Sequence, residues 1–129
     1  MDKREEGMEG EKIAAGYLEG VGYSVLDKNF HTRYGEIDLI ALDKNGEIVF
    51  AEVKTRRAKS FGYPEEAVDE RKIKKMIKTA NIWLDGKNQL DSEWRMDIIS
   101  IEMDSGTPKI THLQNITQEM DYTSDDKDI

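Results

Sequence analysis

Cysteine is missing from this 129-residue sequence, and proline and histidine occur only twice each. Without cysteine the chain can form neither a disulfide framework nor a thiolate zinc site. No apolar run approaches the length of a membrane-spanning helix, and the opening stretch MDKREEGMEG lacks the hydrophobic segment of a signal peptide. These absences predict a cytoplasmic protein with no membrane segment.

A positive net charge is also lacking: the formal net charge of −8 argues at first against a nucleic-acid partner. The distribution of charge changes this conclusion. Residues 54–78 carry nine basic and four acidic side chains, whereas residues 118–129 carry five acidic side chains and one lysine. We therefore predict one domain over residues 1–116, a disordered acidic tail over residues 117–129, and a basic region compatible with DNA or RNA.

The spacing of apolar residues predicts a mixed α/β domain. Helical periodicity indicates helices over residues 9–20 and 64–86, of which the second, with Pro64 near its start, is the longer. Strand patterns cover residues 23–30, 35–56, 94–103 and 108–113, and the segment 35–56 forms a hairpin around Asn45-Gly46. The order helix, three strands, helix, two strands predicts a central mixed sheet flanked by helices.

The hairpin contains three charged side chains, Asp38, Glu52 and Lys54, within largely apolar arms. A two-residue turn would place Asp38 and Glu52 on opposite faces. A three-residue turn, with Gly46 in the left-handed position of a bulge, would place them opposite each other on one face. We predict the second register, because it collects the charges at one end of one face. Two facing carboxylates repel each other, so this register predicts a cation between them.

These groups are suited to phosphodiester hydrolysis. Asp38, Glu52 and the backbone carbonyl of Val53 are oxygen ligands of the kind that Mg²⁺ prefers. Lys54 could orient or help to deprotonate an attacking water, or stabilise negative charge that develops on phosphorus. On spacing alone a simpler interpretation is favoured, in which Glu52 and Lys54 form an edge-strand ion pair and Asp38 caps a loop.

A wider pattern is carried by four segments: GEIDLIA, VFAEVKTR, FGYPEEAV with the lysine-rich helix after it, and WRMDIISI. Over about residues 7–113 the chain resembles the YraN-like family of small bacterial proteins, which is assigned to the PD-(D/E)XK nuclease superfamily. That superfamily includes restriction endonucleases and archaeal Holliday-junction resolvases. The resemblance implies a restriction-endonuclease-like core and an endonuclease dependent on Mg²⁺ or Mn²⁺. Its substrate would be DNA, in branched or otherwise structured form.

Carried over residue by residue, the resemblance implies that Asp38 and Glu52 bind the metal and that Lys54 is the lysine of the superfamily motif. Glu11 matches an acid on the first helix of the resolvase-like branch. It also shares the apolar stripe of its helix, although a first-turn acid favoured by the helix dipole explains it equally well. Ile37 replaces the proline that names the superfamily, as is common in YraN-like sequences.

Candidate nucleic-acid contacts follow the second hairpin strand. Arg56, Arg57 and Lys59 lie directly after the candidate catalytic residues, where they could contact phosphates irrespective of sequence. Tyr63 could stack on an unpaired base, or it could pack the start of the long helix.

The lysines of the long helix form a second group of candidates. Lys72, Lys75 and Lys78 recur on its exposed side, where they could contact DNA. A solvated helix face with Glu–Lys pairs is the more common explanation of such a run.

Two alternatives to a nuclease remain open. One is a catalytically silent nucleic-acid-binding module of the same fold, which recruits or positions another enzyme. The other is a structural protein whose hairpin charges are merely paired. A homodimer would suit a nuclease that must cut two strands. Elsewhere in the chain we predict an Arg95–Asp97 salt bridge, whereas His112 has no partner in the sequence pattern.

Overall fold

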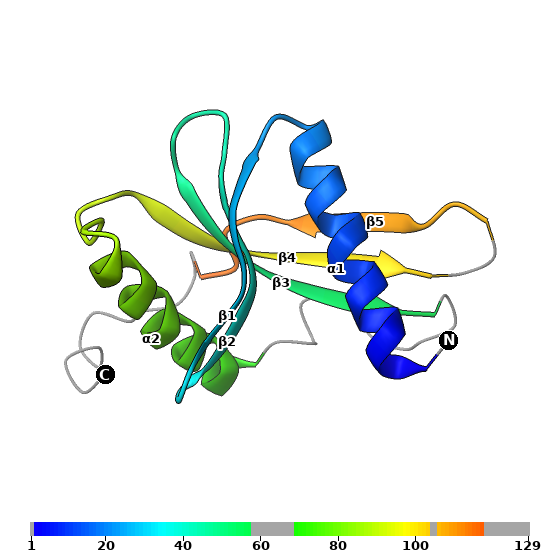
Figure 1. Cartoon of the computed structure of the whole chain (residues 1–129), viewed down its shortest axis with the longest axis horizontal. Coiled ribbons are helices and arrows are strands. Elements are labelled where there is room, and N and C mark those ends of the chain that lie inside the picture. The colour runs from blue at the N-terminus through cyan, green and yellow to red at the C-terminus, as the bar shows by residue number, and fades with distance from the viewer. Residues whose placement is uncertain (1, 58–68, 104–105, 118–129) are drawn as a thin grey trace.

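The computed structural model describes residues 2–57, 69–103 and 106–117 (Figure 1). Its elements are, in order, α1 (Lys3–Gly20), β1 (Ser24–Thr32), β2 (Gly35–Leu42), β3 (Ile48–Arg56), α2 (Glu70–Gly86), β4 (Trp94–Glu102) and β5 (Lys109–Leu113). This is the predicted order of helices and strands. Within these residues no helix is both long and apolar enough to cross a membrane.

The strands form one five-stranded sheet in the order β1-β2-β3-β4-β5. The pair β3–β4 is parallel, and the chain passes through α2 between these two strands. The other neighbouring pairs are antiparallel. The predicted α/β class, with a central mixed sheet flanked by helices, is thereby confirmed.

Two sets of apolar side chains project from opposite faces of the sheet, because side chains alternate along each strand. The set that packs against α1 consists of Leu39, Ala41, Ala51, Ile99 and Ile101. The set that packs against α2 consists of Ile40, Ile48, Phe50, Met96 and Ile98. Since β2, β3 and β4 are covered on both faces, their sequences are nearly continuous apolar runs. Buried charges on these strands therefore require a specific explanation.

Both helices begin at an aspartate cap, and both starts differ from the prediction. The Asp2 carboxylate accepts a hydrogen bond from the backbone N–H of Glu5 at 2.8 Å, and Asp69 accepts one from Lys72 N–H at 2.9 Å. Helix α1 therefore begins at Lys3 and has 18 residues, whereas α2 begins at Glu70 and has 17. The second helix is thus the shorter one. Pro64, expected near its start, lies outside the described residues.

The turn between β2 and β3 has the three residues that were predicted. The backbone N–H of Asp43 donates to the carbonyl of Glu47 at 2.9 Å, which leaves residues 44–46 in the turn. Gly46 has a φ of +88°, in the left-handed region that glycine adopts without strain. The turn therefore determines the register of the whole hairpin.

The ladder of this hairpin pairs Ile40 with Phe50 and ends with the pair Leu39–Ala51. The next two residues are Asp38 and Glu52, in line with each other just beyond the last pair. The predicted register is confirmed, and it brings the two carboxylates to the end of the hairpin that is distant from the turn.

Candidate active site

The strands β2 and β3 separate beyond Leu39 and Ala51. In Figure 1 the β1–β2 hairpin bends away toward the start of α2, while β3 continues beside β4. Asp38 and Glu52 are the first residues after the separation, and both are buried, with exposed fractions of 6% and 5%. The fork between the strands thus places two carboxylates below the surface.

Asp38 is held in the fork by a backbone contact. Its Oδ2 atom accepts a hydrogen bond from the N–H of Val53 at 2.8 Å. Burial, and next the negative charge of Glu52, raise the pKa of Asp38 to about 7, although the Val53 hydrogen bond acts in the opposite direction. Asp38 therefore changes its protonation state near neutral pH, which is typical of groups at functional sites.

Glu52 is neutralised by two lysines. Its Oε2 atom lies 2.6 Å from Nζ of Lys72 and 3.4 Å from Nζ of Lys54. Burial lowers the pKa of Lys72, but the hydrogen bond and charge of Glu52 outweigh it and raise the pKa above its ordinary value. Lys72 therefore remains an ammonium. Lys72, expected on the exposed side of its helix, is only half-buried, but the first turn of α2 directs its ammonium to Glu52.

Helix α1 brings Glu11 to the fork, beside Asp38 and Glu52. Burial raises the pKa of Glu11, a hydrogen bond with the Asn29 side chain lowers it, and the charges of Glu36 and Glu52 raise it further. The preceding residue, Gly10, lets the helix lie directly on β3: a Cβ atom there would be only 1.8 Å from Oγ1 of Thr55. Gly10 was not among the predicted site residues, because its only signal in the sequence is a glycine inside a helical pattern.

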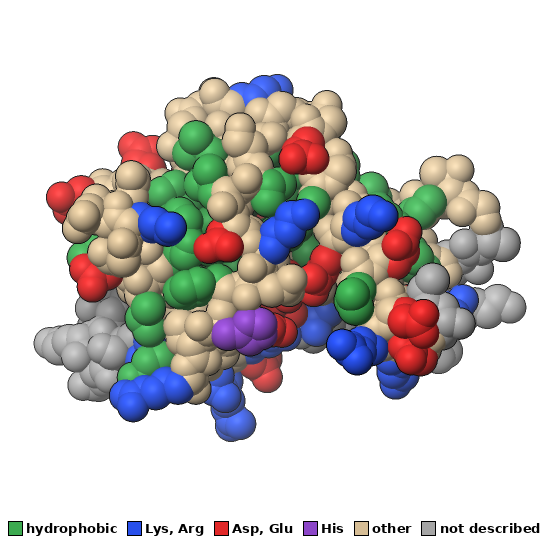
Figure 2. All heavy atoms as spheres, in the orientation of Figure 1, with side chains coloured by type: hydrophobic (Ala, Val, Ile, Leu, Met, Phe, Trp, Pro, Cys, Tyr) green, Lys and Arg blue, Asp and Glu red, His purple; other side chains and the backbone are tan. Residues whose placement is uncertain are grey.

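These residues line a hollow of about 700 Å³ whose walls come from α1, β2, β3 and α2. It contains all four residues that were predicted to be catalytic, Glu11, Asp38, Glu52 and Lys54, together with Val53. Acidic side chains reach the surface in the gap between the lower half of α1 and the β1–β2 hairpin (Figure 2). The fold therefore gathers groups from positions 11 to 72 of the chain at one accessible point.

The candidate nucleic-acid contacts are placed in different ways. Arg56 and Arg57 line the same hollow, and Nη2 of Arg57 lies 2.9 Å from Oε2 of Glu6 on α1. Lys75 is exposed on α2 and lines a neighbouring hollow. Lys59 and Tyr63 lie outside the described residues.

A family model described as "Uncharacterised protein family UPF0102" matches residues 10–101. The chain belongs to this family. A UPF0102 protein of Syntrophomonas wolfei is 48% identical over 112 residues, which are 87% of this chain and 96% of the relative. A UPF0102 protein of Persephonella marina is 43% identical over 117 residues, 91% of this chain and 96% of the relative. The predicted membership of the YraN-like family, which is UPF0102, is confirmed.

Solved structures similar to this UPF0102 chain include a repair endonuclease from Pyrococcus abyssi, with a TM-score of 0.46 and 18% identity. A structure of EndoMS in complex with double-stranded DNA has a TM-score of 0.47 and 22% identity. The similarity covers 82% and 79% of this chain, but only 41% and 37% of those two proteins. The chain thus spans less than half the length of either.

The fork residues of this UPF0102 chain fit a divalent ion by the chemistry of their donors. Asp38 and Glu52 are two buried carboxylates; burial, and next the charge of Glu52, raise the pKa of Asp38, and a cation would offset both effects. Within the described part of the chain Asp38 uses only Oδ2 in a hydrogen bond. The described residues hold no group of three or more histidine, aspartate or glutamate side chains already arranged for a metal. The Val53 carbonyl and water would have to complete the shell.

A second charged cluster lies at the turn end of the hairpin. Arg95 on β4 contacts Asp97 at 3.0 Å, which confirms the predicted salt bridge, and Asp43 at 2.7 Å. His112, which showed no partner in the sequence, lies 2.7 Å from Asp97 and 2.9 Å from the hydroxyl of Tyr17. This network links α1, the β2–β3 turn, β4 and β5, and it is separate from the fork.

Proposed function

We propose that this UPF0102 protein is a metal-dependent endonuclease that hydrolyses phosphodiester bonds of DNA, at branched or otherwise structured sites. The observation that carries the proposal is the pair of buried carboxylates at the fork, Asp38 and Glu52, with Lys54 beside Glu52 in an accessible hollow. The resemblance of GEIDLIA and EVKTR to the PD-(D/E)XK motif supports the same conclusion. The preference for branched DNA rests on the resemblance to resolvases.

The residues at the fork divide the chemistry among them. Asp38, Glu52 and the carbonyl of Val53 would hold Mg²⁺ or Mn²⁺, which when bound lowers the pKa of a water and neutralises phosphate charge. Lys54 keeps its ammonium near Glu52 and would orient the attacking water or donate a hydrogen bond to a phosphate oxygen. Glu11, on the α1 wall of the hollow, would assist by accepting a hydrogen bond from water.

Lys72 contacts the Oε2 atom of Glu52, so an ion that bound to this atom would take the place of the ammonium. Its ammonium sits on a flexible stem at the mouth of the hollow, 37% exposed. A phosphate at the fork would be the natural new partner for this charge. We therefore assign to Lys72 the role of neutralising Glu52 in the free protein and of contacting phosphate in the complex.

The decisive experiment is cleavage of end-labelled duplex, single-stranded, flapped and four-way-junction DNA in Mg²⁺ or Mn²⁺. The wild-type protein would be compared with Glu52→Gln and with a control, Glu19→Gln, which removes an exposed carboxylate from α1 outside the hollow. We expect cutting by the wild type and the control, and loss of cutting in Glu52→Gln. Equal cutting by all three proteins would indicate a contaminating nuclease or a different site.

A second candidate function is a catalytically silent DNA-binding module of the same fold. The observation that favours it is the 2.6 Å contact of Lys72 with Glu52, because an ammonium there already supplies the positive charge that the carboxylate requires. This candidate predicts salt-sensitive DNA binding in EDTA that survives Glu52→Gln, with no cutting by any variant. Direct titration of Mn²⁺ into the wild type separates the two candidates, since only the nuclease requires an ion at the fork.

Cutting both strands of a junction needs two such sites, so we also propose that the protein acts as a homodimer. Light scattering of the protein with and without junction DNA tests this point. A monomer in both conditions would contradict it.

A further inference from the structure

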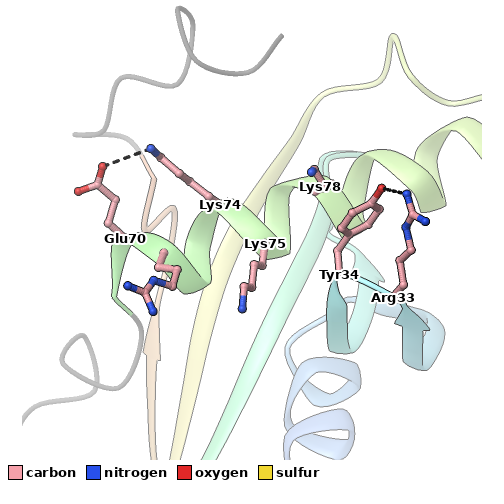
Figure 3. Close-up of a pocket in the computed structure, with 7 residues that line it drawn as sticks. Arg33, Tyr34, Glu70, Lys74, Lys75 and Lys78 are labelled. Atoms are coloured by element: carbon pink, nitrogen blue, oxygen red, sulfur yellow. Dashed lines mark hydrogen bonds and ion pairs between the residues drawn. The ribbon is translucent and has the colours of Figure 1, made fainter. Parts of the chain in front are cut away.

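A second hollow, of about 630 Å³, lies between the β1–β2 turn and α2 (Figure 3). Six of the residues that line it define what we call the basic groove: Arg33, Tyr34, Arg71, Lys74, Lys75 and Lys78. Five of the six are basic, and the seventh lining residue, Glu70, lies 3.8 Å from Nζ of Lys74 (Figure 3). The lining therefore has five basic residues against one acidic residue, although the chain as a whole has a net charge of −8. Such a local excess attracts an anionic partner against the overall charge of the protein.

Tyr34 is the aromatic member of the groove and lies among its cations. Figure 3 shows Tyr34 on the turn, next to Lys78 on α2 and linked to Arg33. Nζ of Lys78 lies 4.2 Å from the centre of the Tyr34 ring, and Nη2 of Arg33 donates to the Tyr34 hydroxyl at 2.7 Å. The hydrogen bond from Arg33, and then the charges of Arg33 and Lys78, lower the pKa of Tyr34. The guanidinium carbon of Arg33 also lies over the ring, 4.9 Å from its centre, so a base that stacks on Tyr34 takes the place of one of these two cations.

The groove leads to the fork. A third hollow, of about 450 Å³, shares Tyr34, Arg71 and Lys75 with the groove. It shares Glu36, Glu52 and Lys72 with the fork hollow, and Asp69 also lines it, so the basic residues of this passage lie on α2 beside acidic ones. A chain of phosphates that lay along α2 would therefore pass from Lys78 and Lys75 to Lys72, the lysine that is bound to Glu52.

We propose that the basic groove binds single-stranded nucleic acid, with phosphates along α2 and one base stacked on Tyr34. An aromatic platform within a cationic groove is the combination that single-stranded segments recognise, because only an unpaired base offers a free face for stacking. The groove would thereby deliver the unpaired arm of a branched substrate to the fork. This delivery rests on the proposed function, whereas the binding itself does not.

The test is fluorescence anisotropy with a labelled thymidine oligonucleotide of about 15 nucleotides, which exceeds the length of the groove, and with a duplex of equal length. The measurements are made in EDTA so that no cutting occurs. The variants are Arg71→Gln/Lys75→Gln within the groove and Tyr34→Leu. The matched control, Lys28→Gln/Lys109→Gln, removes two charges from exposed residues of β1 and β5.

We expect Arg71→Gln/Lys75→Gln to weaken binding of the oligonucleotide about tenfold or more and to reduce the slope of log K against log salt by about 1.4, which corresponds to two phosphate contacts. Tyr34→Leu should weaken binding of the oligonucleotide about 5- to 100-fold and leave duplex binding nearly unchanged. Tyr34→Phe keeps the ring and should retain most of the affinity. The charge control should stay within about twofold of the wild type.

Two outcomes would overturn the proposal. One is oligonucleotide binding by Tyr34→Leu that equals the wild type; the other is an equal effect of the groove variants and the charge control. Repeating the titrations with Glu52→Gln separates this proposal from the nuclease. Groove-dependent binding without cutting by the wild type would retain the groove and reject the nuclease. If the wild type cuts DNA and the groove variants cut and bind as the wild type does, the nuclease would be retained and the groove proposal rejected.

Discussion

The two ends of the β2–β3 hairpin both bury carboxylates, but they compensate them differently. At the turn end, Asp43 and Asp97 share the guanidinium of Arg95. Burial acts to raise the pKa of Asp43, but the N–H of Glu47 and the Arg95 guanidinium outweigh it and lower the pKa. At the fork, burial and a neighbouring acid raise the pKa of Asp38 to about 7. Asp43 thus has a guanidinium partner, whereas at the fork both lysines contact Glu52, and Asp38 has only the Val53 hydrogen bond within the described residues.

This difference separates structure from function. A buried charge with a full set of partners stabilises one arrangement, whereas one that remains under-compensated is available to bind a cation or a proton. Arg95, 9% exposed, has partners on three of its nitrogens. Asp38 has one hydrogen bond, from Val53, within the described residues. The comparison therefore assigns the turn end to stability and supports the proposed role of the fork as the active site.

The largest expected effect comes from the turn end. Arg95→Met leaves three carboxylates without their shared cation, among them Asp97, which is fully buried. We expect a loss of about 3–5 kcal/mol in the free energy of unfolding, measured by urea denaturation. A loss below about 1 kcal/mol would show that the network is not essential to the fold, and would remove the contrast with the fork.

Gly10→Ala tests how closely α1 must approach the fork. The new Cβ atom would clash with Thr55, so α1 has to shift, and with it Glu11. We expect a destabilisation of about 1–3 kcal/mol by thermal or urea unfolding. The matched control is Gly16→Ala on the same helix, where nothing lies within 4 Å of the added atom. That change should be neutral or stabilise the protein by up to about 1 kcal/mol; equal effects of the two substitutions would refute the close approach.

At alkaline pH Asp38→Asn should raise the free energy of unfolding, whereas Arg95→Met should lower it. The folded-state pKa of about 7 lies above the unfolded value of about 3.9, so the folded protein binds more protons between these values and loses stability as the pH rises through them. The substitution removes this cost. Urea denaturation should show Asp38→Asn to be more stable than the wild type at pH 8, by up to about 4 kcal/mol for a pKa that changes by about 3 on folding, and the difference should shrink toward pH 4. The raised pKa would be disproved if the free energy of unfolding of the wild type did not fall, relative to that of the variant, between pH 4 and pH 7.

Divalent ions should compensate the carboxylates of the fork and so reduce its difference from the turn end of the hairpin. A concentration of Mn²⁺ ten times its dissociation constant should stabilise the wild type by about 1.4 kcal/mol, seen as a rise in Tm. The rise should be absent from Asp38→Asn and Glu52→Gln and present in Glu19→Gln. At pH 7 binding should also release protons, because Asp38 is then partly protonated. Titration calorimetry in buffers of different ionisation enthalpy measures this release, and its absence would place the ion elsewhere.

The sequence by itself determined the parts of this protein that depend on neighbouring residues. The turn residues permitted two registers, and the three-residue turn was chosen because it collects the charges on one face. With that turn length, alternation along the strands predicted that Asp38 would face Glu52, because a turn of known length sets the pairing of every later residue. The order of helices and strands followed from the same local periodicities. The start of α2 did not, since the prediction placed it near Pro64, whereas the helix is capped by Asp69.

Only the tertiary structure decided which distant side chains meet. Lys72 reaches Glu52 across 20 positions, and His112 reaches Tyr17 across 95. Gly10 mattered only once α1 was known to lie on Thr55. Such contacts depend on how helices pack on a sheet, and packing is set by the sum of many apolar contacts that no local pattern records. The sequence therefore identified the charged groups, whereas the tertiary structure determined which of them are partners.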